Sequence, residues 1–235
     1  MSGIVGKNLG RGSGVVTATP VGADAVSGAN VADDAIDSEH LADNAVTSTG
    51  AGSPPAFEAA AGGGVWNIIN TAVASGSSTV DITGLDSTYD TYCIMISDMV
   101  PGTDGQSIRF LCGDSGGIDS ASTDYAFHHA RSTEGSASYV GYAHAGNANI
   151  ILGTSAGSAA GEGWGFTIWL HRPGDGTTQP NFSWTGLSIT CGGILTQHAG
   201  AGMRQAVIAL DRVQVKASEG NIATGRMTVY GIAHA

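Results

Sequence analysis

Branched aliphatic residues recur at every fifth position between Val16 and Val46. The stripe consists of Val16, Val21, Val26, Val31, Ile36, Leu41 and Val46, with almost only small or polar residues between its members. A strand would send positions five apart to opposite faces, and five residues of a helix turn the side chain roughly 140° from its starting face. The pattern therefore predicts a chain that alternates about one helical turn with an extended step.

A ten-residue unit overlies this period of five. From Gly22 the chain reads GADAVSGANV, ADDAIDSEHL and ADNAVTSTGA, with Ala fourth in each unit and Val or Ile fifth. One large apolar side chain in five cannot offset the ordering entropy of a single chain, whereas several copies wound together would bury the stripe on a shared axis. We therefore predict an oligomeric stalk over residues 16–50, most simply a homotrimer. The alternative is a low-complexity, unstructured linker.

From Val65 onward the chain changes to short β-rich runs separated by clusters of Gly, Asp, Ser and Pro. This spacing is typical of an antiparallel β-sandwich. The predicted fold class is therefore all-β, with a jelly-roll-like C-terminal head over residues 65–235. Pro101, Pro173 and Pro180 are expected between strands, where proline is tolerated. The expected strands are 66–74, 79–83, 91–98, 107–112, 138–143, 149–152, 165–171, 181–191, 205–216 and 226–232.

Two Gly-rich segments flank the predicted stalk. Residues 1–15 carry only Lys7 and Arg11 as charges and are expected to be flexible until they order on a partner. Residues 51–64 contain Pro54, Pro55 and three consecutive glycines, which predicts a linker.

Composition excludes several classes of function. The 235 residues include 37 glycines, only 12% of them are charged, and the net charge is −11. Nucleic-acid binding needs a basic footprint, and an anionic membrane surface would also repel this chain. No window approaches a transmembrane span, so we expect no membrane insertion. The start of the chain lacks the apolar core of a signal peptide, which favours folding in a reducing cytoplasm.

The three cysteines, Cys93, Cys112 and Cys191, lie in apolar runs without a CxxC pair. This arrangement predicts free, buried thiols on strands and no zinc site. Of the histidines, His128 and His129 are adjacent and would point to opposite faces of a strand, whereas His144, His171 and His198 are expected to stand alone. One histidine from each chain of a trimer is the remaining route to a metal site, and we predict neither metal nor cofactor.

No Walker, GxSxG, HExxH or EF-hand motif is present, and we expect no enzymatic activity. A glycosidase needs two carboxylates facing one bond, but the acids in or beside Gly-rich loops are expected to form turns. These acids are Asp114, Asp119, Asp124, Glu134, Glu162 and Asp175.

Four tryptophans, Trp66, Trp164, Trp169 and Trp184, offer a possible platform for stacking on a sugar. Trp169 and Trp184 lie inside expected strands, so core packing is the favoured use for both. Trp164 stands between two glycines and is the best candidate for an exposed, receptor-binding ring.

The unit ADDAIDSEHLADNAV resembles the ADxAI(T/D)xxxLAxxAV decads in the shafts of bacteriophage tail fibres and other bacterial fibrous proteins. The segments WNIINTAVASGSSTVDITGLDSTYDTYCIMISDMVPGTDG and VQVKASEGNIATGRMTVYGI are similar to the C-terminal module of phage fibre and tail-appendage proteins. Residues 1–15 and about 114–163 match neither. The resemblance implies an antiparallel sandwich head on a trimeric fibre, with no catalytic residues to transfer.

The expected function is a structural virion protein of a tailed phage, assembled in the host cytoplasm. Residues 1–20 would attach the homotrimer to other virion proteins, and the projecting head can contact the host surface. A receptor-binding protein that recognises a host glycan is the alternative, and a carbohydrate-degrading tailspike enzyme is a more distant one. The sequence leaves open the receptor and the position on the particle, whether collar, capsid, baseplate or tail tip.

Overall fold

The structure is a computed structural model that describes residues 66–171 and 175–232. The aliphatic stripe, the attachment segment and the Gly/Pro linker lie outside the described residues. All helices and strands assigned within residues 66–171 and 175–232 are β-strands, and every strand pairing there is antiparallel. The prediction of an all-β head is therefore confirmed.

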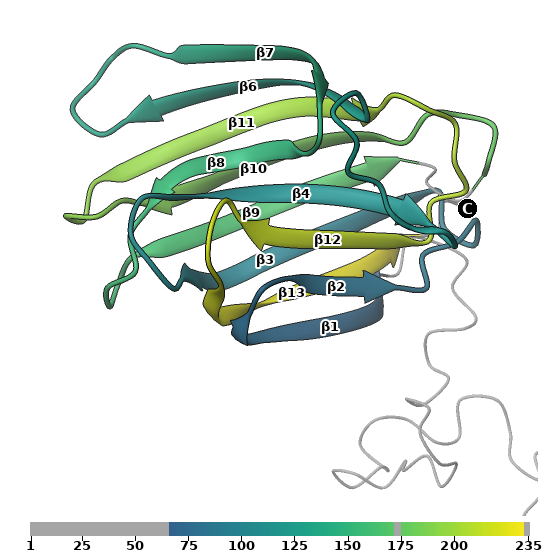
Figure 1. The fold of residues 1–235 in the computed structure, drawn as a ribbon, viewed down its shortest axis with the longest axis horizontal. Coiled ribbons are helices and arrows are strands. Elements are labelled where there is room, and N and C mark those ends of the chain that lie inside the picture. Colours follow the sequence, from purple (N-terminus) through teal and green to yellow (C-terminus); the bar gives the residue numbers. More distant parts are fainter. Residues whose placement is uncertain (1–65, 172–174, 233–235) are drawn as a thin grey trace, which may run out of the picture. The chain divides into compact units, whose positions relative to one another are not determined.

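The strands belong to two sheets (Figure 1). The larger sheet has the order β1-β13-β3-β9-β10-β11-β6-β7, and the smaller has the order β2-β12-β4-β5, with β8 also paired to β4. The strands are β1 (Trp66–Ser77), β2 (Val80–Thr83), β3 (Thr91–Pro101), β4 (Gln106–Asp114), β5 (Gly117–Ile118), β6 (Tyr125–Thr133), β7 (Val140–Asn147), β8 (Ile150–Ala156), β9 (Gly163–His171), β10 (Asn181–Ile189), β11 (Leu195–Arg204), β12 (Arg212–Ala217) and β13 (Ile222–Ile232).

Eight of these strands pair in a nested order. The first strand pairs with the last, β2 with β12, β3 with β9, and β4 with β8. We call these eight strands the nested core. The remaining long strands, β6, β7, β10 and β11, continue the larger sheet beyond β9, and we call them the extension. Because β10 and β11 follow β9 whereas β6 and β7 precede β8, two separate insertions meet at the β11–β6 pairing.

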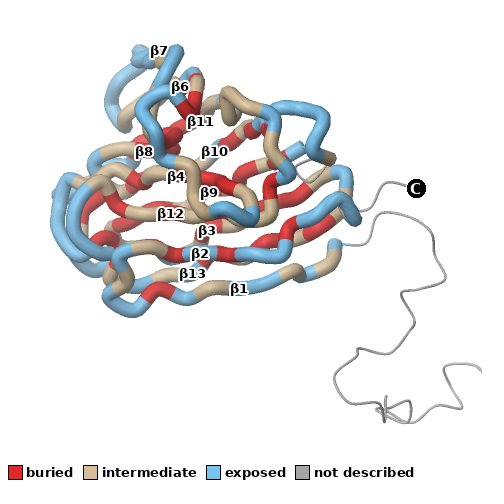
Figure 2. The backbone as a smooth tube through the Cα atoms, turned by 45° about the vertical axis from the view of Figure 1, so that its right-hand side comes forward, coloured by how far each residue is buried: buried red, intermediate tan, exposed pale blue. Residues whose placement is uncertain are grey.

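The apolar core lies between the two sheets (Figure 2). Alternate residues of each strand point inward, so Ile94 on β3, Phe110 on β4 and Val229 on β13 are fully buried. The Phe110 ring packs edge-on against Phe182 of β10, with their centroids 5.1 Å apart. On β13 Tyr230 points outward, as the alternation predicts.

Glycines on the inner face of the extension make room for aromatic rings. A methyl group added at Gly200 would overlap the Trp184 ring and the His128 carbonyl, and one added at Gly186 would overlap Phe166. Since an inner-facing side chain is missing at these positions, the rings of neighbouring strands fill the space beneath them.

Each predicted strand overlaps an observed one, but some bounds are wrong and other strands were missed. Strands β6 and β11 were not expected, and residues 205–211, expected to begin a strand, form a loop before β12. Pro101 is the last residue of β3 and pairs with Ile222, not part of a connection between strands. In β11 the inward positions are Thr196, His198 and two glycines, so the apolar alternation that marks a strand is missing.

Candidate functional site

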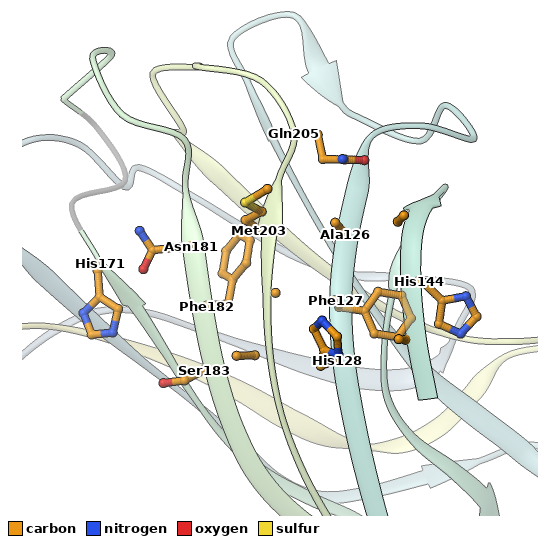
Figure 3. A pocket seen from close by; sticks show the side chains of 14 residues that line it. Ala126, Phe127, His128, His144, His171, Asn181, Phe182, Ser183, Met203 and Gln205 are labelled. Atoms are coloured by element: carbon orange, nitrogen blue, oxygen red, sulfur yellow. The ribbon is translucent and has the colours of Figure 1, made fainter. Parts of the chain in front are cut away.

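The outer face of the extension contains a large hollow. It has a volume of about 710 Å³, and we call it the outer groove (Figure 3). Its floor is formed mainly by small side chains on β6, β7 and β11, among them Ala126, Ala143 and Ala201. Cross-strand pairing places Ser183, Ala201, His128 and Ala143 in one row, in that order.

Polar groups line one side of the outer groove and one point within its floor. His171, Asn181 and Ser183 come from β9 and β10, whereas His128 lies on β6. Asn181 is directly opposite His171 in the sheet, and both are exposed. These groups can donate and accept hydrogen bonds, but none of them carries a permanent charge.

A chain of hydrogen bonds runs beneath this face, inside the extension. His129 Nε2 lies 2.9 Å from His198 Nδ1, and His198 Nε2 lies 2.9 Å from the Ser188 hydroxyl. The Ser188 hydroxyl donates to the Thr154 carbonyl oxygen at 2.9 Å. His198 and Ser188 are fully buried, and His129 is nearly so.

The Thr154 carbonyl at the end of this series of hydrogen bonds determines which atom donates in each of them. Because a carbonyl only accepts, the Ser188 hydroxyl must receive its other hydrogen bond from His198 Nε2–H. His198 Nδ1 then accepts from His129 Nε2–H. Burial lowers the pKa of His129 to about 4 and that of His198 to about 3, so both imidazoles are neutral at pH 7.

This arrangement differs from the nucleophilic serine of a hydrolase. A nucleophile must face a substrate and have its proton withdrawn by the neighbouring imidazole. Ser188 is inaccessible, and its proton is directed to a backbone carbonyl instead. The chain is suited to joining β6, β11, β10 and β8 through polar contacts.

A second polar link joins the extension to the nested core. The Tyr125 hydroxyl, at the start of β6, accepts from the Cys112 N–H of β4 at 2.9 Å and lies 2.9 Å from the Cys112 carbonyl oxygen. Arg204 at the end of β11 pairs with Asp119 at 2.9 Å and with Asp124 at 3.1 Å. Both carboxylates therefore neutralise a guanidinium that is itself largely buried.

All six loop acids have partners within the chain, in turns as predicted or, for Asp119 and Asp124, in ion pairs with the largely buried Arg204. Glu162 accepts from the Ala159 and Gly192 N–H groups, each at 2.9 Å. Hydrogen bonds from the Thr177 and Thr178 N–H groups lower the pKa of Asp175 to about 2. Asp114 accepts from Gly116 and Glu134 from Leu195, while Asp119 and Asp124 pair with Arg204.

Trp164 is buried, with 3% of its surface exposed, which contradicts its expected role as an exposed receptor-binding ring. It lies inside β9, whose alternation turns it toward the core. Trp184 is also buried, as predicted, and donates its indole N–H to the Leu152 carbonyl oxygen. Core packing was wrong for Trp169, which is partly buried on the outer face of β9. There the exposed ring of Trp66 packs edge-on against Trp169, with centroids 5.7 Å apart, and against Tyr230, with centroids 5.6 Å apart.

The predictions for histidine and cysteine are partly wrong. His198 does not stand alone, since it contacts both His129 and Ser188. All three thiols are free, but Cys191 lies in the turn after β10 and is exposed, whereas Cys93 and Cys112 are buried as expected. The spacing of His129 and His198 in the sequence could not show that these two inward positions, on β6 and β11, lie side by side in the sheet.

Among residues 66–171 and 175–232, no three side chains of His, Cys, Asp or Glu lie close enough to hold a metal ion. Within the same ranges, no helix is long and apolar enough to cross a membrane. No protein-family model, curated protein or solved structure matches the chain.

Proposed function

We propose that the chain is a structural virion protein of a tailed bacteriophage, a homotrimeric fibre or appendage that attaches through residues 1–20. The observation that carries this proposal is the aliphatic stripe from Val16 to Val46 with its decad repeat. A period of five has no use within one chain, but three copies place each stripe residue in a ring around a common axis. Each buried aliphatic side chain contributes about 1.5–3 kcal/mol, which can offset the entropy of association.

The topology of the head supports the same proposal. Eight strands that pair first with last, second with second-last and so on inward follow the order of a jelly roll, a fold used in viral capsids and lectins. We therefore propose a jelly-roll head, enlarged by the extension, that projects from the particle. The six loop acids already form hydrogen bonds or ion pairs within the chain, which favours a structural head over a carbohydrate-degrading tailspike.

Light scattering on the purified full chain tests the trimer. We expect a trimer, and we expect the double variant Ile36→Asp, Leu41→Asp to dissociate on dilution because it would bury six charges on the axis. The matched control, Ser38→Asp with Asn44→Asp, adds the same charges away from the stripe and should remain trimeric. A monodisperse wild-type monomer at micromolar concentration overturns the proposal.

Glycan recognition by the head is a second candidate, and the exposed ring of Trp66 favours it. An aromatic face suits the apolar face of a sugar ring, and Trp66 is 43% exposed beside Trp169 and Tyr230. A glycan array probed with the full chain and with Trp66→Ala tests this candidate. Binding that is lost in Trp66→Ala but kept in Val73→Ala, an exposed residue on the same strand, supports it; binding by neither wild type nor variants contradicts it.

A further inference from the structure

We infer that the outer face of the extension is the surface on which a second copy of this chain packs. The inference rests on the proposed trimer and specifies where the heads touch. Its first support is charge: the outward-facing residues of β6, β7, β9, β10 and β11 include no Asp, Glu, Lys or Arg. A surface strand normally keeps such residues on its solvent face.

The outer face of the smaller sheet shows the contrast. Asp81 on β2, Arg109 on β4, and Arg212 and Lys216 on β12 point away from the core there. Each chain carries a net charge of −11, so two copies repel one another wherever charged faces approach. The outer face of the extension can therefore be covered by another chain without burying an unpaired charge of its own, and the nearest charges beside Val73 on the other edge, Arg226 and Asp98, pair with each other.

Shape gives the second support. The outer groove is one of several hollows on this face: another of about 580 Å³ lies over β6, β7 and β11, and one of about 360 Å³ lies over β3, β9 and β10. Ala130, Ala199 and Gly141 floor the second hollow, where larger side chains would fill the space. Small side chains allow the backbone of a neighbouring molecule to approach closely.

The same sheet carries projecting aliphatic side chains at its other edge. Ile68 and Val73 of β1 point outward and are 67% and 71% exposed. Projections at one edge and hollows at the other form a head-to-tail contact between copies, and such a contact closes into a ring when the rotation allows. A three-fold ring satisfies both this geometry and the proposed stalk.

The chemistry of the floor favours a protein surface over a sugar. Alanine methyl groups and glycine backbone offer dispersion contacts, but few of the hydrogen bonds that sugar hydroxyls require. His171, Asn181 and Ser183 lie to one side of this floor, on β9 and β10, and His128 is the polar side chain between the alanines. We therefore assign the outer groove to Ile68 and Val73 of a neighbouring copy.

Thiol accessibility in the full-length chain tests the interface. In a Cys191→Ser background, Ala201→Cys places a thiol on the groove floor, and Thr83→Cys places a matched thiol on an exposed strand of the smaller sheet. We expect maleimide to modify the first at least tenfold more slowly than the second in the native trimer, and at equal rates in denaturant. Adding Ile68→Asp to the Ala201→Cys variant should remove the protection without changing the thermal transition of the head.

The outcomes separate the two proposals. Equal native rates in a chain that light scattering shows to be trimeric overturn the interface and leave the proposed function intact. A monomeric chain overturns the proposed function. Protection of the thiol that persists in a monomer would mean that the chain's own residues cover the groove, and it would overturn packing by a second copy.

Discussion

The larger sheet runs without a break from the nested core into the extension, yet the two parts are stabilised differently. Strands of the nested core bury almost only apolar side chains, such as Ile94, Ile108 and Val229. The buried polar residues of the described structure are in the extension or the turns that lead into β6 and β8: Asp124, His129, Asn149, Ser188, Thr196 and His198.

This difference shows how a sheet can be widened where its apolar cover is narrower. The smaller sheet covers the nested core, but over the extension it contributes β8, through Trp184 with Leu152 and Arg131 with Thr154, and part of β4, through Phe110 with Phe182. Directed hydrogen bonds and glycine-lined spaces for aromatic rings supplement this narrower apolar layer. Polar contacts of this kind stabilise only while every member keeps its partner, so we expect the extension to be the more sensitive part to pH.

The largest effect should come from the nested core. Phe110→Ala would leave a cavity beside Phe182, because Phe110 is fully buried between the sheets. We expect the free energy of unfolding to fall by about 3–5 kcal/mol, measured by denaturant titration. Leu187→Ala, at a partly exposed position on the outer face of the extension, is the control and should change stability by less than about 1 kcal/mol. Similar losses for both variants would contradict the distinction between core and surface.

The second effect is a pH dependence specific to the extension. The pKa values of His129 and His198 are about 4 and 3 in the folded state and about 6.5 in the unfolded state. Below pH 6.5 the unfolded chain therefore binds protons that the folded chain does not, and stability falls with decreasing pH. The expected slope is up to about 1.4 kcal/mol per pH unit for each histidine.

This loss should span pH 6.5 to about 4 for both histidines and continue to about 3 for His198. Unfolding titrations across that range measure it. The double variant His129→Gln, His198→Gln should lose the dependence, whereas His128→Ala, which changes the exposed neighbour, should keep it. An unchanged slope in the double variant would show that other groups cause the pH dependence.

A smaller effect is expected from the glycine spaces. Gly200→Ala forces a methyl group against Trp184, and overpacking of this kind costs about 1–3 kcal/mol. Gly141 lies on β7 with open space around its Cα, so Gly141→Ala should be nearly neutral. Thermal unfolding of both variants gives the comparison, and equal transitions would contradict the packing of Trp184 over Gly200.

The smallest perturbation is chemical modification of the native thiols. Burial raises the pKa of Cys93 to about 11 and that of Cys112 to about 12, whereas Cys191 lies exposed at the end of the extension. Alkylation of the native protein followed by mass spectrometry should therefore find only Cys191 modified. All three thiols should react in denaturant, and early reaction of Cys112 would indicate that the link from β4 to Tyr125 opens in the native state.

Sequence patterns predicted the nested core better than the extension. Strands β3 and β13 alternate or concentrate large apolar residues, so their existence follows from periodicity alone. Strand β11 could not be found in this way, because its inward positions are Thr196, His198, Gly200 and Gly202. Those residues make sense only beside His129 and Trp184, which are distant in sequence.

The candidate site was harder to predict than the fold. The outer groove depends on alanines from strands that meet through two separate insertions, and alanine gives no signal of its own. Trp164 was misjudged because flanking glycines suggested a loop, whereas the cross-strand pairing of β9 with β3 and β10 fixes it as an inward position.

The pairing of the first strand with the last has a consequence for synthesis of the chain. Thr71 of β1 contacts Thr228 of β13 across 157 residues of sequence, so β1 leaves the ribosome long before its partner exists. Contacts of such long range make folding slow and leave strand edges open to aggregation in the meantime. The head can close only after β13 has left the ribosome, which places any assembly of heads after synthesis of that strand.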